Sequence, residues 1–495
     1  MSSKALLMEF AALSRSLGAR HIGFSAEKGF TSVSIDSRTV REGALFIALS
    51  GQNTDGHGHV RAAFEAGAQA VMAASSKLEQ FDLQRTAESL GKDLIVVDDT
   101  LKGFQQAARV YLDGFPNLIR IGITGSSGKT TSKEICAAIT SREKNTVSNQ
   151  GNLNSEIGLP LSVFNVRSCH ELGIFEIAMN RRNEIAELTD IVKPDIAAIT
   201  NIGNAHVGLL GSKQAIAGEK KSIFSRFTGS ELALIPADDE YSDFLSRDVN
   251  GRICFYNASS FDELGGIRDM GLEGSEIIWD GQTVHFSLPG RHNLANALTA
   301  LAIARELKIS PASVKSGLES VQPLFGRSEI LRGSVTVIRD CYNANPESLR
   351  RALEFCDSLE WPGRKVYVIG DMLELGAESR QAHTQMGRLL SLSDADAVFL
   401  FGTETQAAAR ILAAEENAPE ENAPAAVPAD ASVGQSKLRL HTADMDQLSA
   451  SLCAFLKPGD LVLLKASRGL SLERLCELPI LKTGRAAPAG GKACS

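Results

Sequence analysis

Short apolar runs alternate with segments of helical period along most of the chain. Each run of Val, Ile, Leu and Ala predicts a buried strand, and each amphipathic segment predicts a helix. The predicted strands are 32–35, 43–49, 70–73, 94–97, 118–123, 174–178, 195–200, 232–235, 335–340, 365–369, 397–401 and 461–464. The predicted helices are 1–18, 60–66, 132–139, 183–188, 212–224, 297–307 and 347–355. This alternation indicates an α/β protein whose parallel, doubly wound sheet binds ligands at the carboxyl ends of its strands.

The alternation divides into three α/β units. We predict an N-terminal domain at residues 1–113, a central domain at 114–323 and a C-terminal domain at 324–482, with a hinge at 323–327. A chain of 495 residues is expected to form about two to four domains. Residues 416–433 are rich in Ala, Glu, Pro and Asn and indicate a low-complexity surface insert, and residues 483–495 indicate a disordered tail.

The glycine-rich turn after the strand 118–123 is the strongest chemical signal. It reads Gly125, Ser126, Ser127, Gly128, Lys129, Thr130 and Thr131, and a predicted helix follows at once. Glycines let backbone N–H groups approach phosphate oxygens, and the amino end of the helix adds its positive dipole. Lys129 would reach the outer phosphates and the Thr130 hydroxyl would hold Mg²⁺. A full P-loop pattern has glycine where this chain has Ile123, so a glycine turn with a solvated lysine is the alternative.

Two further polar residues fall at the ends of predicted strands. Glu176 lies in an otherwise apolar strand, where a carboxylate is costly unless it is paired or binds a metal ion. His206 follows the strand 195–200. With Thr130 they predict a metal site at this edge of the sheet, although a lone histidine is more often structural.

Polar clusters in the N-terminal unit have two interpretations. The triplets 36–38 (Asp-Ser-Arg) and 55–57 (Asp-Gly-His) lie at strand ends and in loops, where ligand contacts concentrate. The same residue types also cap helices and form turns without binding a ligand. The pattern alone favours neither interpretation.

Composition limits the classes of function. A net charge of −8 and a pI of about 5.7 leave no basic footprint for nucleic acid or anionic membrane. No apolar run approaches the roughly 18 residues of a membrane span, and the amino terminus resembles an amphipathic helix rather than a signal peptide. Eight scattered cysteines without a Cys-x-x-Cys pair predict reduced thiols and a cytoplasmic protein.

The motifs together resemble those of the Mur ligases, the ATP-dependent amide-forming enzymes of peptidoglycan precursor synthesis. The family P-loop is Thr-Gly-x-x-Gly-Lys-Thr/Ser, and residues 124–131 fit it without a glycine at position 123. The resemblance spans about residues 34–473. It is greatest to the branch that adds D-alanyl-D-alanine to UDP-N-acetylmuramoyl-tripeptide, through the segments 200–206, 342–346 and 370–376. The Asp-Asn-Pro-Arg motif typical of the branch that adds a diamino acid is not found.

The resemblance implies an architecture and a reaction. The N-terminal domain would bind the UDP end of the substrate, the central domain ATP and two Mg²⁺ ions, and a Rossmann-like C-terminal domain the incoming dipeptide. ATP would phosphorylate the terminal carboxylate of the peptide, and the dipeptide amine would attack the acyl phosphate. Because every step brings anions together, the protein must supply cations. A monomer is expected, with no nucleic-acid or membrane partner.

The resemblance also implies roles for single residues. Lys129, Lys220, His206 and Glu176 would be catalytic, and Thr130, Glu176, His206 and Lys220 would hold the metal ions. Residues 125–131 would bind the ATP phosphates, with Asn296 at the adenine, Arg327 at the phosphates and Asp340 at the ribose. The substrates would be contacted by Ser37, Arg38, Asn152, Asn154, Tyr342, Asn343 and Asn345. One departure is Arg339, which stands where the family usually has the first of two acidic residues.

Lys220 has a particular implied role. By spacing alone it is a solvated lysine on the helix 212–224. Mur ligases usually carry a carbamylated lysine four residues before an aromatic residue, and Lys220 has this spacing to Phe224. The adjacent Lys221 is the alternative candidate. Carbamylation by CO₂ would turn a cation into a ligand with two oxygens, which a second Mg²⁺ prefers.

Two alternatives to this function stay open. The nearer one is a Mur ligase for another amino acid, or a polyglutamate-type ligase. The more distant one is a P-loop switch or nucleotide-binding module without ligase activity.

Overall fold

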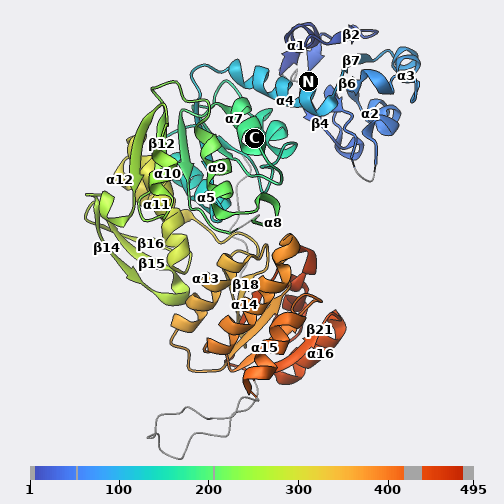
Figure 1. The fold of residues 1–495 in the computed structure, drawn as a ribbon. Coiled ribbons are helices and arrows are strands. Elements are labelled where there is room, and N and C mark those ends of the chain that lie inside the picture. Colours follow the sequence, from blue (N-terminus) through green and yellow to red (C-terminus); the bar gives the residue numbers. More distant parts are fainter. Residues whose placement is uncertain (1–5, 52–53, 205–206, 417–436, 483–495) are drawn as a thin grey trace, which may run out of the picture.

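The chain folds into three α/β units in the order of the sequence. The computed structural model describes residues 6–51, 54–204, 207–416 and 437–482. The blue, green-to-yellow and orange parts of Figure 1 are these three units. The predicted α/β class with three domains is confirmed. Within the described ranges, no helix has the length and apolar character needed to cross a membrane.

The N-terminal unit is built on a five-stranded sheet of order β2-β7-β6-β5-β4. Only β2 runs antiparallel to its neighbour. The strands are β2 (Arg20–Ile22), β4 (Ser32–Ser34), β5 (Ala44–Ile47), β6 (Ala68–Ala74) and β7 (Asp93–Val97). The helices are α1 (Phe10–Leu17), α2 (Val60–Glu65), α3 (Leu83–Leu90) and α4 (Thr100–Asp113), and a small ribbon joins β1 (Met8–Glu9) to β3 (Gly29–Phe30). The predicted helix 1–18 is therefore shorter than expected, and a strand precedes it.

The central unit holds a six-stranded parallel sheet of order β13-β12-β11-β8-β10-β9. Its strands are β8 (Ile119–Thr124), β9 (Thr146–Ser148), β10 (Leu172–Glu176), β11 (Ile196–Ile199), β12 (Leu232–Pro236) and β13 (Arg252–Tyr256). Its helices are α5 (Lys129–Thr140), α6 (Gly158–Val163), α7 (Glu184–Val192), α8 (Val207–Leu210), α9 (Lys213–Lys221), α10 (Ser242–Ser246), α11 (Arg291–Glu306) and α12 (Pro311–Ser320). Strands that follow β8 in the sequence are added on both of its sides, so the strand order reverses at β8, and ligands of such sheets bind at that switch point.

An antiparallel sheet, which the sequence patterns did not predict, extends the central unit. It consists of β14 (Leu264–Asp269), β15 (Ser275–Trp279) and β16 (Gln282–Phe286). Trp279 and Phe286 are buried and join the core formed by α5 and α11 on one face of the parallel sheet.

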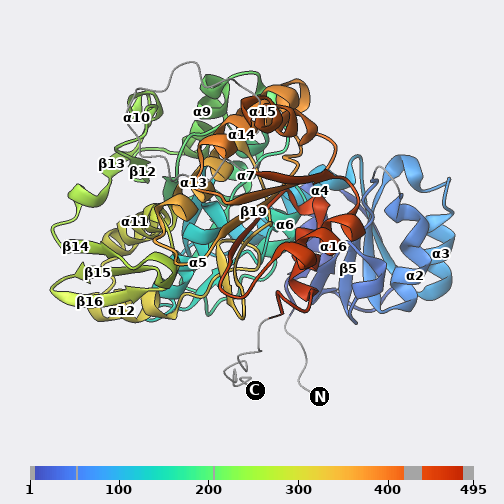
Figure 2. The ribbon, with the colours of Figure 1, turned by 90° about the horizontal axis from the view of Figure 1, so that it is seen from below.

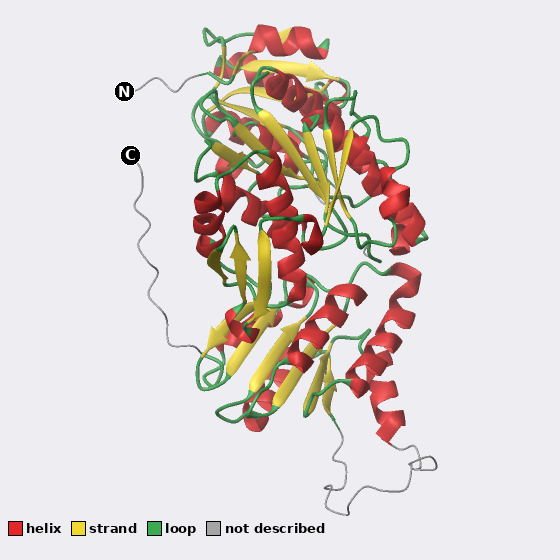
Figure 3. Cartoon of the chain, turned by 90° about the vertical axis from the view of Figure 1, so that its left-hand side faces the viewer, coloured by secondary structure: helices red, strands yellow, loops and turns green. Residues whose placement is uncertain are grey.

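The C-terminal unit has a sheet of order β17-β18-β22-β19-β20-β21, parallel except for β17. Its strands are β17 (Glu329–Arg332), β18 (Thr336–Asp340), β19 (Lys365–Gly370), β20 (Ala397–Phe401), β21 (Leu438–Thr442) and β22 (Leu461–Lys465). The helices α13 (Pro346–Ser358), α14 (Ser379–Leu392), α15 (Gln406–Glu416) and α16 (Met445–Phe455) cover its faces (Figure 3). The predicted insert 416–433 lies almost wholly outside the described residues, as does the predicted tail 483–495.

The N-terminal and central units share one apolar core. Phe164, which follows α6, stacks on Phe104 of α4 with ring centroids 6.1 Å apart, and it lies 5.0 Å from the ring of Tyr111. The Tyr111 hydroxyl donates to the carbonyl of Val166 at 2.6 Å. The helices α4 and α6 lie between the two units in Figure 2. This continuous packing holds the two units together, whereas the C-terminal unit follows the linker 321–328 and contacts the central unit through polar side chains such as Arg351 and Arg332.

Candidate functional site

The predicted phosphate loop lies between β8 and α5, where only glycine fits two positions. Gly125 has φ +154° and Gly128 has φ +78°. A Cβ on Gly125 would lie 1.8 Å from Thr200 Oγ1, and one on Gly128 would lie 2.0 Å from Asn296 Oδ1. The Thr200 hydroxyl, just past β11, also donates to the carbonyl of Ser127 at 2.7 Å. The loop is thus fixed by the end of the neighbouring strand and by α11, as a preformed backbone cradle requires.

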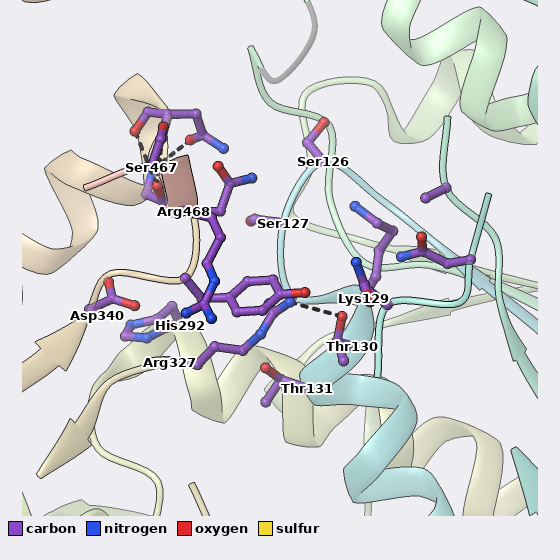
Figure 4. A pocket seen from close by; sticks show the side chains of 18 of the residues that line it. Ser126, Ser127, Lys129, Thr130, Thr131, His292, Arg327, Asp340, Ser467 and Arg468 are labelled. Carbon is purple, nitrogen blue, oxygen red and sulfur yellow. Dashed lines mark hydrogen bonds between the residues drawn. The ribbon is translucent and has the colours of Figure 1, made fainter. Parts of the chain in front are cut away.

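A cavity of about 410 Å³ opens between this loop and the C-terminal unit. Figure 4 shows Lys129 and Thr130 at the start of α5, with Arg327 facing Thr130. The linker and the C-terminal unit form the opposite wall. Most of the residues predicted from the sequence line this one cavity: Ser126, Ser127, Gly128, Lys129, Thr130, Thr131, Asn152, Asn154, Glu176, Asn296, Arg327, Asp340, Tyr342, Asn343 and Asn345.

Two cations converge on the loop. Lys129 Nζ donates to the carbonyl of Gly125 at 2.9 Å, and Arg327 Nη2 donates to Thr130 Oγ1 at 3.2 Å. Burial lowers the pKa of Lys129, and the charge of Arg327 adds to this effect while the carboxylate of Glu176 opposes it. A phosphate group in the cavity would therefore meet two positive side chains and the amino end of α5.

Glu176 presents a free carboxylate oxygen. It ends β10 and is 1% exposed. Asn154 Nδ2 donates to Oε1 at 2.7 Å, whereas Oε2 is buried and has no hydrogen-bond partner among the described residues. A buried carboxylate oxygen without a donor is costly, and a hard cation would satisfy it. Glu176 and the Thr130 hydroxyl therefore fit a Mg²⁺ ion bound together with phosphate oxygens.

Part of the predicted metal site is not defined by the structure. His206 lies outside the described residues. In the described ranges no group of three or more His, Cys, Asp or Glu side chains is placed to hold a metal ion. Of the predicted metal ligands, the structure places Thr130 and Glu176, both with oxygen atoms, in the lining of the cavity.

Lys220 is buried on α9 of the central unit and is not among the residues that line the cavity. Lys220 is 1% exposed. Burial holds its pKa well below the usual range, and the charge of Lys129 adds to this shift. Next to it, Glu219 accepts from the backbone N–H groups of Asn183 at 2.9 Å and Ile185 at 3.1 Å, which fixes the rotation of α9.

Lys221 has a different environment. Its Nζ donates to the carbonyl of Phe244 at 3.0 Å and to that of Arg247, both at the end of α10. The ammonium also lies 5.0 Å from the centroid of the Phe244 ring. Lys221 therefore connects α9 to α10.

The cavity lining includes residues that the sequence analysis did not select, among them Lys465 of the C-terminal unit and His292 of α11 in the central unit. Lys465, at the end of β22, forms an ion pair with Asp340 Oδ2 at 2.9 Å, and His292 Nε2 lies 3.1 Å from Ser328 Oγ. Burial lowers the pKa of His292 to about 4, against the attraction of Asp340. His292 and Lys465 stand beside predicted motifs, which is the only signal that could have identified them.

Arg351 is another missed residue. It lies in the middle of α13, where sequence offers no signal. Its Nη1 donates to Ser127 Oγ at 3.2 Å, and its Nη2 pairs with Glu347 Oε1 at 2.5 Å. The C-terminal unit therefore touches the phosphate loop directly.

A second cavity of about 560 Å³ lies between the N-terminal and central units. Its lining includes Thr31, Ser32, Ser34, Thr39 and Arg41 from the first unit and Leu153, Leu161, Phe164, Asn165 and Arg167 from the second. Ser37 and Arg38 are in the turn beside it and are not in its lining. Arg38 is exposed and pairs with Asp36 at 2.7 Å, and the Asp36 side chain accepts from the Arg38 N–H, as the turn interpretation expects.

Known proteins match this chain over nearly its full length. Residues 29–109 match the Mur ligase family catalytic domain, 123–304 the Mur ligase middle domain and 326–468 the Mur ligase glutamate ligase domain. A UDP-N-acetylmuramoyl-tripeptide–D-alanyl-D-alanine ligase of Treponema pallidum is 42% identical over 471 residues, which cover 94% of this chain and 97% of that protein. A protein of the same name from Bacillus subtilis is 31% identical over 449 residues, covering 90% and 92%.

Solved structures give the same result. A crystal structure of MurF from Acinetobacter baumannii superposes with a TM-score of 0.80 at 26% identity and covers 95% of this chain and 98% of that one. The structure of MurF from Thermotoga maritima in complex with ADP has a TM-score of 0.72 at 27% identity, covering 91% and 97%. The chain belongs to the Mur ligase family.

Proposed function

We propose that the protein is an ATP-dependent ligase that adds D-alanyl-D-alanine to UDP-N-acetylmuramoyl-tripeptide, releasing ADP and phosphate. The relatives that cover almost the whole chain carry the name of this ligase, and a structural relative binds ADP. One observation in this molecule carries the proposal. Asn152 and Asn154 line the phosphate-loop cavity, whereas Leu153 between them lines the second cavity. One extended substrate could therefore reach from the second cavity to the phosphate loop across a single segment.

The nucleotide would occupy the first cavity. Lys129, Arg327 and the backbone of residues 125–128 would hold its phosphates, with Asn296 at the adenine and Asp340 at the ribose. Asp340 is oriented by its ion pair with Lys465. We propose the domain limits 1–113, 114–323 and 324–482, with the nucleotide bound between the second and third domains.

Mg²⁺ would be held at Glu176 Oε2 and the Thr130 hydroxyl, with His206 as a further predicted ligand. When bound, it would polarise phosphate oxygens and neutralise their charge. Lys220 would supply a second pair of anionic oxygens as a carbamate. Its burial and the lowered pKa support this, because only a neutral amine reacts with CO₂. The contacts of Lys221 with α10 favour Lys220 over its neighbour.

The UDP end of the substrate would bind in the second cavity. Arg41, the serine hydroxyls of β4 and the hydroxyls of Thr31 and Thr39 offer donors there for a diphosphate or a uracil ring. Ser37 and Arg38 stay predicted contacts, since they border this lining without joining it. Asn343 and Asn345 lie on the opposite wall of the first cavity, where the incoming dipeptide would bind with Tyr342.

The chemistry proceeds in two steps. A carboxylate oxygen of the tripeptide attacks the γ-phosphorus of ATP, the bond from that phosphorus to the bridging oxygen breaks, and ADP leaves. The neutral amine of the dipeptide then attacks the acyl carbon, and the tetrahedral intermediate expels phosphate and loses a proton. Lys129 and Arg327 would stabilise the growing negative charge in both steps because they are already in place.

An acceptor panel tests the proposed specificity. D-alanyl-D-alanine, lysine, diaminopimelate and glutamate are offered separately with ATP, Mg²⁺ and UDP-N-acetylmuramoyl-tripeptide, and phosphate release is recorded. We expect turnover with the dipeptide. Turnover with a single amino acid instead would favour another Mur ligase or a polyglutamate-type ligase. We further propose a monomeric, cytoplasmic enzyme without nucleic-acid or membrane partners, which light scattering and cell fractionation can test.

A further inference from the structure

Three arginines and two aromatic rings form one continuous stack beside the phosphate-loop cavity. The Arg339 guanidinium lies 4.2 Å from the centroid of Phe325. Arg468 lies 5.2 Å from Phe325 and 5.9 Å from Tyr342, and Arg327 lies 4.3 Å from Tyr342. Each distance is within the range of an attractive cation–π contact. The order of the stack is therefore Arg339, Phe325, Arg468, Tyr342, Arg327.

The outer end of the stack is anchored to the hinge. Arg339 Nη2 and Nε donate to Glu329 Oε2 at 2.6 and 2.9 Å, and the two residues face each other across β17 and β18. The same oxygen accepts from the N–H of Gly326 at 3.2 Å. Gly326 has φ +66° and its carbonyl accepts from the Tyr342 N–H at 3.0 Å. The turn that carries Phe325 is thus tied to both strands.

The inner end of the stack touches the phosphate loop. Arg327 Nη2 donates to Thr130 Oγ1 at 3.2 Å, the hydroxyl proposed to hold Mg²⁺. In the middle, Arg468 is 54% exposed and is held by the two rings and by an ion pair with Glu473 at 3.0 Å. Arg468 and Arg327 are both labelled in Figure 4. The orientation of Arg327 therefore depends on Tyr342, and that of Tyr342 on the residues beyond it.

The two outer members lie outside the cavity. Neither Phe325 nor Arg339 is in its lining. Phe325 is 46% exposed, so its burial adds little to the core, and its two guanidinium contacts are what hold the ring. Arg339 also stands where the family resemblance leads us to expect an acidic residue. A carboxylate there would be repelled by the face of the ring and by Glu329.

We propose, on the basis of the ATP site proposed above, that Phe325 and Arg339 are positioning residues for the nucleotide phosphates. They hold Arg468 and Tyr342 in line, and this line holds the Arg327 guanidinium against the loop. Loss of either outer member leaves the cavity lining intact but lets Arg327 leave Thr130. Affinity for ATP falls as a result, while binding of the UDP substrate in the second cavity does not change.

The first test replaces the ring. Phe325→Leu removes the π face, Phe325→Tyr keeps it, and Phe255→Leu is a matched control on the edge strand β13, where Phe255 is 43% exposed. Calorimetry with a non-hydrolysable ATP analogue should show about three- to tenfold weaker binding for Phe325→Leu. The KM for ATP should rise equally while the KM for the UDP substrate and the unfolding midpoint stay unchanged. Phe325→Tyr and Phe255→Leu should match wild type.

The second test asks whether the effect passes through the stack. Phe325→Leu is combined with Tyr342→Leu, and Arg339→Gln is compared with Arg332→Gln, whose arginine also lies on the β17–β18 pair and forms an ion pair with Glu273 of the central unit. If the stack transmits the effect, Phe325→Leu costs nothing further in the Tyr342→Leu background, and only Arg339→Gln weakens ATP binding.

Failure of this inference is distinct from failure of the proposed function. Wild-type protein that does not bind the ATP analogue would refute the ATP site itself. Wild-type protein that binds it, with Phe325→Leu equal to Phe255→Leu or with fully additive losses, would refute only the positioning role of the stack.

Discussion

Replacement of Lys220 is expected to separate its chemical role from its packing role. The side chain is fully buried on α9, so Lys220→Ala leaves a cavity, whereas Lys220→Met fills nearly the same volume. By analogy with buried Met→Ala changes, the alanine variant should lose about 2–5 kcal/mol of unfolding free energy. The methionine variant should lose little or gain, because no amine must give up its proton on folding.

Both variants should lose activity to a similar degree. Removing one preorganised ligand of the reaction centre costs on the order of 10²-fold in kcat or more. Acetate should restore part of the activity of Lys220→Ala, because its two oxygens can occupy the space of the missing carbamate. It should not rescue Lys220→Met, in which that space is filled.

The assay is phosphate release with saturating ATP, UDP-N-acetylmuramoyl-tripeptide and D-alanyl-D-alanine, at a temperature well below the unfolding midpoint of each variant. Lys221→Ala is the matched control, since its ammonium binds carbonyls of α10, and it should be nearly silent in activity. An active Lys220→Ala, equal rescue of both Lys220 variants by acetate, or an inactive Lys221→Ala would refute the carbamate assignment.

The remaining predictions concern the loop, the hinge, one titrating group and the second cavity. Lys129→Ala should lose on the order of 10²-fold or more in turnover with an unchanged fold, and near-wild-type turnover would argue against the cradle. Small-angle scattering should show compaction on adding an ATP analogue with the UDP substrate, and a constant radius of gyration would contradict domain closure. Burial lowers the pKa of His292 from 6.5 to about 4, so between these pH values the unfolded chain binds a proton that the folded protein does not. The stability that comes from the neutral, buried imidazole is therefore complete above pH 6.5 and is lost as the pH falls toward 4. The unfolding free energy of the wild type should therefore fall by up to about 3 kcal/mol more than that of His292→Gln over this pH range, as measured by thermal unfolding. Parallel plots of unfolding free energy against pH for the two proteins would exclude the effect. Ser37→Ala and Arg38→Ala should raise the KM for the UDP substrate more than that for ATP, and Arg41→Ala should do so most strongly; equal effects on both substrates would favour the turn interpretation.

The strands and helices that build the parallel sheets were predictable because their patterns are simple. Buried parallel strands such as β20 and β22 are almost entirely apolar, and each is bounded by glycine or polar residues. The antiparallel sheet β14–β16 was missed because it is short and largely exposed, and β14 carries two glycines at 265–266. Its stability comes from the packing of Trp279 and Phe286 on the core, and no local sequence pattern predicts this packing.

Some residues of the candidate site could likewise be predicted from the sequence, and others could not. The phosphate loop was predictable from a contiguous motif, and the structure brings Glu176, 47 positions after Lys129, to the same edge through the parallel sheet. Arg351 and Lys465 of the opposite wall were not predicted, because they come from separate elements that meet only when the third unit folds against the second. Tertiary packing decides such contacts, and a single sequence carries no record of it.

The most direct test of the proposed ligase is the substrate dependence of phosphate release. Purified protein is incubated with ATP and Mg²⁺ and with neither substrate, UDP-N-acetylmuramoyl-tripeptide alone, D-alanyl-D-alanine alone, or both. Phosphate release is recorded, and the products are identified by mass spectrometry. We predict sustained phosphate release only when both are present, in equal amount to a product that joins tripeptide and dipeptide by an amide bond. Steady release with neither or only one of them, or release without this product, would contradict the account and favour a nucleotide switch or simple ATPase.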